Sequence, residues 1–164
     1  MSRKLVVVPT YNEAENISDL ISDILKLDLD ILVVDDNSPD NTSERVKEHK
    51  LFNSKVFLLS RDQKLGLGSA YREGFQWGIN LQYDFLIEMD ADFSHSTQDL
   101  MIMLGNIEDN SLIIGSRYIN GGKIIGWSRK RHLLSFVANK YSKFLTFSSI
   151  NDMTSGFRIY TSEA

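Results

Sequence analysis

The chain has no cysteine, only two prolines and no long run of apolar residues. The absence of cysteine excludes disulfide bonds and thiolate metal sites. Apolar runs such as residues 5–8 are no longer than four or five residues, whereas a helix that crosses a bilayer needs about 20. No apolar stretch near the first residues is followed by small residues, so a signal peptide is not expected. These absences favour a cytoplasmic domain that does not span a membrane.

Carboxylates are missing from one long stretch of the sequence. Residues 110–151 contain seven Lys or Arg and no Asp or Glu, while residues 1–109 contain 10 basic and 20 acidic side chains. The net charge of −4 therefore averages a strongly acidic part with a strongly basic one. A solvated basic face explains the charge alone, but such a stretch is also typical of proteins with an anionic partner.

The length of 164 residues suits one domain, and folding at this size buries roughly 70% of the surface of the unfolded chain. Short apolar runs alternate with segments that have a helical period, which predicts an α/β fold with a doubly wound, mostly parallel sheet. We expect strands over residues 4–9, 31–35, 55–60, 84–89 and 111–116, and helices over 17–25, 69–81 and 97–107, with a polar helix after residue 42. Beyond residue 116 we expect a loop over 117–130, an amphipathic helix over 131–147 and a strand over 156–161.

Two carboxylates, Asp90 and Asp92, directly follow the fourth predicted strand. Ligands of doubly wound sheets bind beyond the carboxyl ends of the strands. Two carboxylates at this place can hold a hard divalent cation, and Mg²⁺ or Mn²⁺ is favoured over zinc because the chain has no thiol and few histidines. His95 is interpreted as a structural hydrogen-bonding residue and not as a ligand.

Glycine and arginine mark two further loops. Gly66 and Gly68 open a predicted helix, but the spacing is that of neither a dinucleotide motif nor a P-loop, so a tight turn into the helix is the preferred interpretation. Arg117, Arg129 and Arg131 lie in or beside the loop after the fifth strand, where guanidinium groups can bind phosphate oxygens. A nucleic-acid partner is not expected, because the isoelectric point is near 5.3.

Together these motifs resemble the polyprenol-phosphate mannosyltransferases, which include the dolichol-phosphate mannose synthases of glycosyltransferase family 2. The similarity runs in order from residue 5 to about residue 160. The motifs that carry it are Pro9-Thr10-Tyr11-Asn12-Glu13, Val34-Asp35-Asp36-Asn37-Ser38-Pro39-Asp40, Lys64-Leu65-Gly66-Leu67-Gly68-Ser69-Ala70-Tyr71, Met89-Asp90-Ala91-Asp92-Phe93-Ser94-His95, Gly115-Ser116-Arg117-Tyr118 and Thr154-Ser155-Gly156-Phe157-Arg158.

The resemblance implies a GT-A fold and inverting transfer of mannose from GDP-mannose. It assigns binding of the guanosine to Pro9, Tyr11, Glu13, Val34 and Asp36, with Asp36 on the ribose. It places Asp90, Ala91 and Asp92 along the diphosphate, with Arg117 counted among the residues around the donor. The resemblance makes Asp92, together with Ser94 and Asp90, the ligands of the Mg²⁺ or Mn²⁺ ion.

The resemblance also implies a polyprenyl (dolichyl-type) phosphate as the acceptor. Arg117, Arg131 and Ser135 would bind its phosphate, and Asp92, Arg117, Arg131 and Asp152 would form the catalytic set. Asp152 would orient the sugar, and a turn or capping role for it is left open. A phosphate monoester is mostly dianionic at neutral pH, so this nucleophile needs no general base. The lipid acceptor predicts peripheral binding at the cytoplasmic face of a membrane, and the oligomeric state is left open.

The expected organisation is a single GT-A domain over residues 1–164. Residues 1–116 form the part that binds the nucleotide sugar and residues 117–164 the part that binds the acceptor. Family members usually continue past the last motif, so the resemblance predicts a domain that is truncated at its C-terminus. Two other functions are considered: transfer of glucose or a related sugar from a UDP-sugar to a lipid phosphate, and binding of a nucleotide sugar without catalysis.

Overall fold

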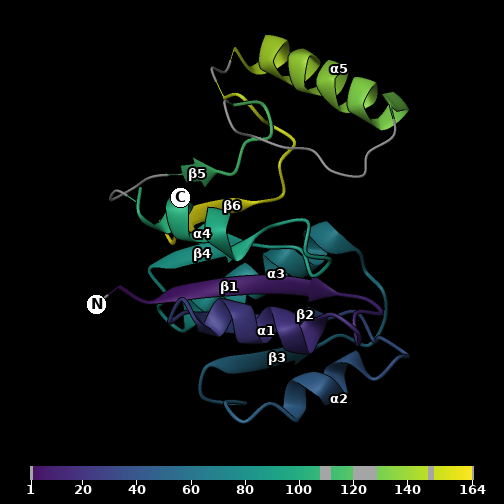
Figure 1. Ribbon diagram of the computed structural model, residues 1–164, viewed down its shortest axis with the longest axis vertical. Coiled ribbons are helices and arrows are strands. Elements are labelled where there is room, and N and C mark those ends of the chain that lie inside the picture. Colours follow the sequence, from purple (N-terminus) through teal and green to yellow (C-terminus); the bar gives the residue numbers. More distant parts are fainter. Residues whose placement is uncertain (1, 108–111, 120–128, 148–149, 164) are drawn as a thin grey trace.

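A computed structural model describes residues 2–107, 112–119, 129–147 and 150–163, without the side chains of residues 129, 131 and 132. Its centre is a six-stranded sheet with the order β3-β2-β1-β4-β6-β5 (Figure 1). The strands are β1 (Lys4–Thr10), β2 (Asp30–Asp35), β3 (Val56–Ser60), β4 (Phe85–Glu88), β5 (Leu112–Ile114) and β6 (Arg158–Thr161). The helices are α1 (Ile17–Leu25), α2 (Thr42–Lys47), α3 (Leu67–Asn80), α4 (Thr97–Leu104) and α5 (Arg129–Thr146).

The pairing of the strands confirms the predicted mostly parallel sheet. Strands β1, β2, β3 and β4 pair in parallel with one another. The exception is β6, which pairs antiparallel with both β4 and β5. Strand β5 therefore runs in the same direction as β4 but is separated from it by the last strand of the chain.

Hydrophobic cores cover both faces of the sheet, because successive side chains of a strand point to opposite sides. Val6 and Val8 of β1 lie in the core under α1, α2 and α4, whereas Leu5 and Val7 lie in the core under α3. The buried side chains of α1 are those that its helical period predicts, namely Ile17, Leu20, Ile21 and Ile24. The two layers of helices fix the carboxyl ends of β1, β2 and β4 at one edge of the sheet.

Helix α5 stands away from both helical layers (Figure 1). The buried side chain of Asn139 links α5 to the segment before β6. Its amide nitrogen donates to the carbonyl of Asn151 (2.6 Å), and its amide oxygen accepts from the backbone amide of Met153 (2.8 Å). Among the residues that the structure describes, no helix combines the length and apolar character needed to cross a bilayer.

Candidate functional site

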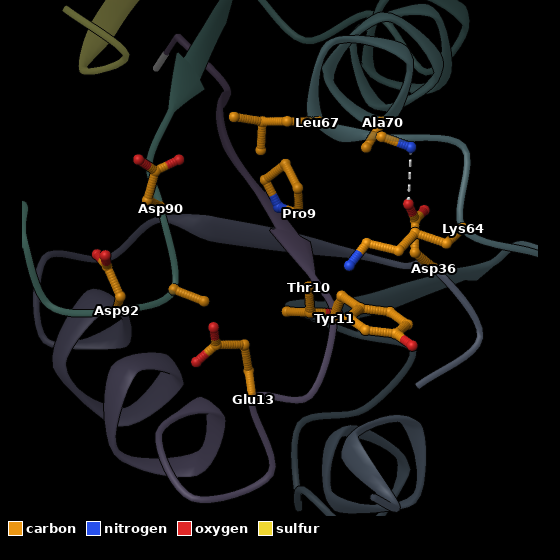
Figure 2. Close-up of a pocket in the computed structure, with 12 residues that line it drawn as sticks. Pro9, Thr10, Tyr11, Glu13, Asp36, Lys64, Leu67, Ala70, Asp90 and Asp92 are labelled. Atoms are coloured by element: carbon orange, nitrogen blue, oxygen red, sulfur yellow. Dashed lines mark hydrogen bonds between the residues drawn. The ribbon is translucent and has the colours of Figure 1, made fainter. Parts of the chain in front are cut away.

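A pocket of about 280 Å³ lies beyond the carboxyl ends of β1, β2 and β4 (Figure 2). Four carboxylates and one lysine line it, together with small and apolar side chains. The lining residues are Pro9, Thr10, Tyr11, Glu13, Asp36, Lys64, Gly66, Leu67, Ala70, Asp90, Ala91 and Asp92. This is the edge of the sheet at which doubly wound proteins bind their ligands.

The segment after β1 forms one wall of the pocket. Its backbone is held by the segment after β2, because the amide of Asn12 donates to Ser38 Oγ (2.9 Å) and the amide of Glu13 donates to Thr42 Oγ1 (3.0 Å). The Tyr11 ring is 38% exposed, and Lys64 Nζ lies 3.5 Å from its centroid. Such a cation–π contact places a positive charge and an aromatic face together at the mouth of the pocket.

Asp36 fixes the loop that leads into α3. Its carboxylate forms a buried ion pair with Arg61 and accepts hydrogen bonds from the amides of Leu65 (3.1 Å) and Gly66 (3.0 Å). Arg61 in turn donates to the carbonyl of Gly66 (3.1 Å) and to Ser69 Oγ (2.7 Å). Gly66 has φ +91°, a conformation that favours glycine. This agrees with the predicted tight turn into the helix.

Asp90 and Asp92 lie on the side of the pocket opposite Asp36 and Lys64 (Figure 2). Tyr71 of α3 donates its hydroxyl to Asp90 Oδ1 (2.9 Å), and the amide of Ser94 donates to Asp92 Oδ1 (2.9 Å). Burial raises the pKa of Asp92, but its bonds from Ser94 outweigh this and the net pKa lies below the ordinary value. The carboxylate is thus held in its charged form beside the pocket.

His95 packs under this loop as a structural residue, as predicted. Its Nδ1 accepts from the amide of Asp90 (3.1 Å), which makes Nε2 the protonated nitrogen of the neutral ring. The ring stacks on Phe157 with a centroid distance of 4.6 Å. Burial lowers the pKa of His95 despite the nearby charges of Asp90 and Asp92.

Arg117, three residues beyond β5, forms a two-point ion pair with Asp152. Arg117 Nε donates to Asp152 Oδ2 (2.7 Å) and its terminal nitrogen donates to Oδ1 (2.8 Å), while the Arg117 amide adds a bond of 3.1 Å. Asp152 is fully buried. Burial raises the pKa of Asp152, but the bonds and positive charge of Arg117 hold it below the ordinary value.

Helix α5 reaches the segment after β5 through two hydroxyl groups. Ser135 Oγ lies 2.9 Å from the hydroxyl of Tyr118, and the Arg117 guanidinium lies 5.7 Å from the centroid of the Tyr118 ring. Arg131 belongs to the first turns of α5, and its side chain falls outside the described part of the structure.

The pocket brings together most of the residues that the resemblance assigned to the nucleotide sugar: Pro9, Tyr11, Glu13, Asp36, Asp90, Ala91 and Asp92. Val34 is not among them, because its side chain is fully buried in the core under α3. Ser94, Arg117, Ser135 and Asp152 also lie outside the pocket lining.

Five further lining residues are not among those that the resemblance assigns to the nucleotide sugar: Thr10, Lys64, Gly66, Leu67 and Ala70. All five belong to motifs that carry the resemblance, and membership of these motifs is the feature of the sequence that indicates a place in the site. Arg61 is not among them either, although its position directly after a predicted strand places it at the same edge of the sheet as the candidate residues.

The six-stranded sheet with helices on both faces is a fold of the GT-A type. The model of glycosyl transferase family 2 matches residues 5–164, and the chain belongs to this family.

Two curated relatives match almost the whole chain. The polyprenol monophosphomannose synthase of Mycolicibacterium smegmatis is 42% identical over 165 residues, covering 98% of this chain and 62% of the relative. The undecaprenyl-phosphate mannosyltransferase of Micrococcus luteus is 37% identical over 163 residues, covering 98% of this chain and 67% of the relative. The chain thus spans about two thirds of the length of these relatives.

Two solved structures share the fold. A mycobacterial protein superposes over 99% of this chain and 54% of its own, with a TM-score of 0.64 and 19% identity. A mannosyltransferase of Pyrobaculum calidifontis, solved with GDP-Man and Mn²⁺, covers 62% of this chain and 31% of its own, with a TM-score of 0.51 and 24% identity.

Proposed function

We propose that this protein transfers mannose from GDP-mannose to a polyprenyl phosphate, with inversion at the anomeric carbon and with Mg²⁺ or Mn²⁺. The observation that carries the proposal is the pocket in which the Asp90 and Asp92 carboxylates face the segment bearing Tyr11 and Glu13. The names of the two curated relatives support this choice of sugar and acceptor.

The donor would bind along the pocket from Asp36 to Asp92. Tyr11 and Pro9 offer flat apolar contact to the guanine base, and the Glu13 carboxylate offers an acceptor to its N1–H and its amino group. Asp36 would contact the ribose, and its carboxylate also holds this loop through Arg61 and the amides of Leu65 and Gly66. Val34 would contact the donor only through its backbone, since its side chain is buried.

The chemistry of the carboxylates fits a hard divalent cation. The described residues contain no group of three or more His, Cys, Asp or Glu side chains that could hold a metal. Asp90 and Asp92 can supply two oxygen ligands, with Ser94 beside them, and Mg²⁺ and Mn²⁺ usually complete their shells with water and substrate phosphates. When bound, the ion neutralises charge on the departing diphosphate.

The acceptor phosphate would approach from the side of Arg117. An oxygen of the dianionic phosphate forms the new bond to the anomeric carbon, while the bond to the GDP oxygen breaks and GDP keeps the electron pair. Arg117, with Arg131 and Ser135 on α5, would orient the acceptor phosphate against the repulsion of the diphosphate. Asp152 would act as a positioning residue, because it orients the Arg117 guanidinium.

Within one domain, residues 1–116 would bind the donor and residues 117–164 would bind the acceptor. The acceptor is a lipid, so the reaction would take place at a membrane surface, with the enzyme bound peripherally on the cytoplasmic side.

The test is transfer of labelled mannose from GDP-mannose to a short polyprenyl phosphate, with Mg²⁺, with Mn²⁺ and with a chelator. Asp92→Asn keeps the shape of the side chain and removes its charge, and is expected to lower transfer by at least about 100-fold. Asp19→Asn makes the same change on the exposed surface of α1 and should leave transfer unchanged.

A parallel titration compares GDP with UDP in the presence of the metal. Tighter binding of UDP, or transfer that ignores both the chelator and Asp92→Asn, would contradict the proposed function. Binding of GDP-mannose without any transfer would indicate a binding module instead.

A further inference from the structure

Asn16, the residue before α1, turns its side chain toward Glu13 and not toward the helix. At this position an asparagine usually caps the helix by accepting a hydrogen bond from an amide of the first turn. The Asn16 side chain makes no capping bond with α1, and its Nδ2 donates to Glu13 Oε2 instead (2.9 Å). The carboxylate can only accept, so the amide nitrogen of Asn16 must be the atom that faces it. The side chain that could cap α1 is thus bonded to a residue that lines the pocket.

The backbone of Glu13 is fixed independently of this contact. Its amide donates to Oγ1 of the buried Thr42 (3.0 Å), and Thr42 Oγ1 donates in turn to Asp40 Oδ1 (2.6 Å). The carbonyl of Glu13 accepts from the amides of Asn16 (3.0 Å) and Ile17 (2.9 Å). Because the backbone is held on both sides, only the rotation of the Glu13 side chain remains to be fixed, and the Asn16 side chain fixes it.

The Glu13 carboxylate keeps the capacity to bind a ligand. Figure 2 shows the Glu13 side chain between those of Tyr11 and Asp92 in the pocket. Among the described residues, none donates a hydrogen bond to Glu13 Oε1, while Oε2 accepts the bond from Asn16. Each carboxylate oxygen can accept two hydrogen bonds. The two oxygens can therefore receive two parallel donors while the bond from Asn16 stays in place.

Two parallel donors are what a guanine base presents. Its N1–H and its 2-amino group lie side by side on one edge, whereas uracil presents a single N–H between two carbonyl oxygens. A carboxylate that lies in the plane of guanine accepts both bonds, but against uracil one of its oxygens meets a carbonyl oxygen. A carboxylate that rotates freely loses much of this discrimination, because selection between ligands depends on unfavourable contacts as well as on favourable ones.

We propose that Asn16 is a positioning residue that sets the selectivity for the nucleobase, by holding the Glu13 carboxylate in one rotation. This inference rests on the proposed function, in which Glu13 binds guanine. Asn16 acts on the base only through Glu13. Its loss should therefore reduce the discrimination between nucleotides and leave the domain folded.

The experiment compares the binding of GDP, inosine diphosphate and UDP by calorimetry in the presence of Mn²⁺. Inosine diphosphate differs from GDP only in lacking the 2-amino group, so the ratio of the two dissociation constants reports the second bond to Glu13. The wild type should prefer GDP by about tenfold or more, since a hydrogen bond to a charged acceptor is lost with inosine diphosphate. Asn16→Ala should lower this ratio by about fivefold. Asn106→Ala removes a side-chain bond to the carbonyl of Ile102 (2.7 Å) just after α4, and should keep the wild-type ratio.

Asn16→Asp is a second variant, in which the substitution itself favours the start of the helix. An acidic residue is favourable at a helix N-terminus, so the fold should be retained, and circular dichroism checks this. The introduced carboxylate lies against that of Glu13 and repels it. The affinity for GDP should therefore fall by about tenfold or more.

An unchanged ratio in Asn16→Ala would overturn the positioning role, even if GDP and inosine diphosphate both bound more weakly, because Asn16 would then be merely structural. Wild-type affinity for GDP in Asn16→Asp, or equal binding of GDP and inosine diphosphate by the wild type, would overturn it as well. These outcomes leave the proposed function intact as long as the wild type binds GDP more tightly than UDP. Tighter binding of UDP by the wild type, or no binding of GDP, would contradict the proposed function, and the role of Asn16 would fall with it.

Discussion

The Arg117 guanidinium and the Asp152 carboxylate form a two-point ion pair, with bonds of 2.7 and 2.8 Å, that links the segment after β5 to the segment before β6. The carboxylate is fully buried, while the Arg117 side chain is 21% exposed. Arg117 Nη2 also donates to Thr154 Oγ1 (2.7 Å). The pair therefore stabilises the fold and orients a cation at the proposed acceptor side.

Asp152→Asn should destabilise the protein by about 2 kcal/mol, somewhat less than the ~3–5 kcal/mol typical of a fully buried pair, because Arg117 retains contact with water. Urea unfolding followed by circular dichroism measures this, with Asp19→Asn as the exposed control. A purely structural Asp152 would leave transfer by the folded fraction intact. The proposed positioning role instead predicts a raised KM for the polyprenyl phosphate in the folded variant.

Asp152 also makes the free energy of unfolding depend on pH. Its pKa in the folded protein is lowered below the ordinary value of 3.8. Its contribution is therefore fully present above about pH 4 and is lost as the pH falls through the lower pKa of the folded state. As the pH falls below about 4, the free energy of unfolding should decrease more steeply in the wild type than in Asp152→Asn. Equal slopes in the two proteins would contradict this assignment.

The periodicity of the sequence predicts most helices and strands, because the pattern of apolar residues that defines each of them lies within its own segment. The stripe of α1 from Ile17 to Ile24 and the apolar run of β1 are local signals, and both are confirmed. The position of β6 between β4 and β5 is not local. Its apolar run predicts a strand, but its neighbours depend on packing of segments more than 40 residues apart in sequence.

The candidate site divides in the same way. The motifs place Tyr11, Glu13, Asp90 and Asp92 in one pocket because each follows a strand end. No local pattern reveals that Asp36 forms an ion pair with Arg61, since the two residues meet only when β2 and β3 lie side by side. The sequence likewise does not reveal that apolar side chains of α5 such as Leu134 and Phe144 are exposed. The helical period shows that they share one side of the helix, but not whether that side packs against the sheet.

The Asp36–Arg61 pair should control both stability and binding of the nucleotide. Asp36→Ala leaves a buried guanidinium and two loop amides without their acceptor, and should destabilise the protein by about 3–5 kcal/mol. Arg61→Lys keeps the charge but cannot reproduce the fork that also holds Gly66 and Ser69. We expect GDP affinity to fall in Arg61→Lys while most of the stability remains. Unchanged affinity in this variant would mean that the loop does not contact the nucleotide.

Two glycines of α3 provide a test of packing against β1. A Cβ at Gly74 would lie 2.4 Å from Val7 Cγ1 and 3.2 Å from Val34 Cγ2, whereas a Cβ at Gly68 meets nothing within 4 Å. Gly74→Ala should therefore destabilise the protein by about 1–3 kcal/mol through overpacking. Gly68→Ala should be neutral or stabilise it by up to about 1 kcal/mol, because alanine favours the helix. Thermal unfolding of the two variants measures the contrast, and equal losses would contradict the close approach of α3 to β1.

Tyr71 should act on the proposed metal site through Asp90. Its hydroxyl donates to Asp90 Oδ1 (2.9 Å) and fixes the orientation of that carboxylate at the pocket. Tyr71→Phe should lower Mn²⁺ affinity, measured by electron paramagnetic resonance in the presence of GDP, by about tenfold. Tyr83→Phe is the matched control, because it removes a similar bond from a buried tyrosine to Asp30 Oδ2 (2.7 Å) outside the pocket. Both variants should lose about 1 kcal/mol of stability, so only a selective loss of Mn²⁺ binding in Tyr71→Phe supports the role of Asp90 as a ligand.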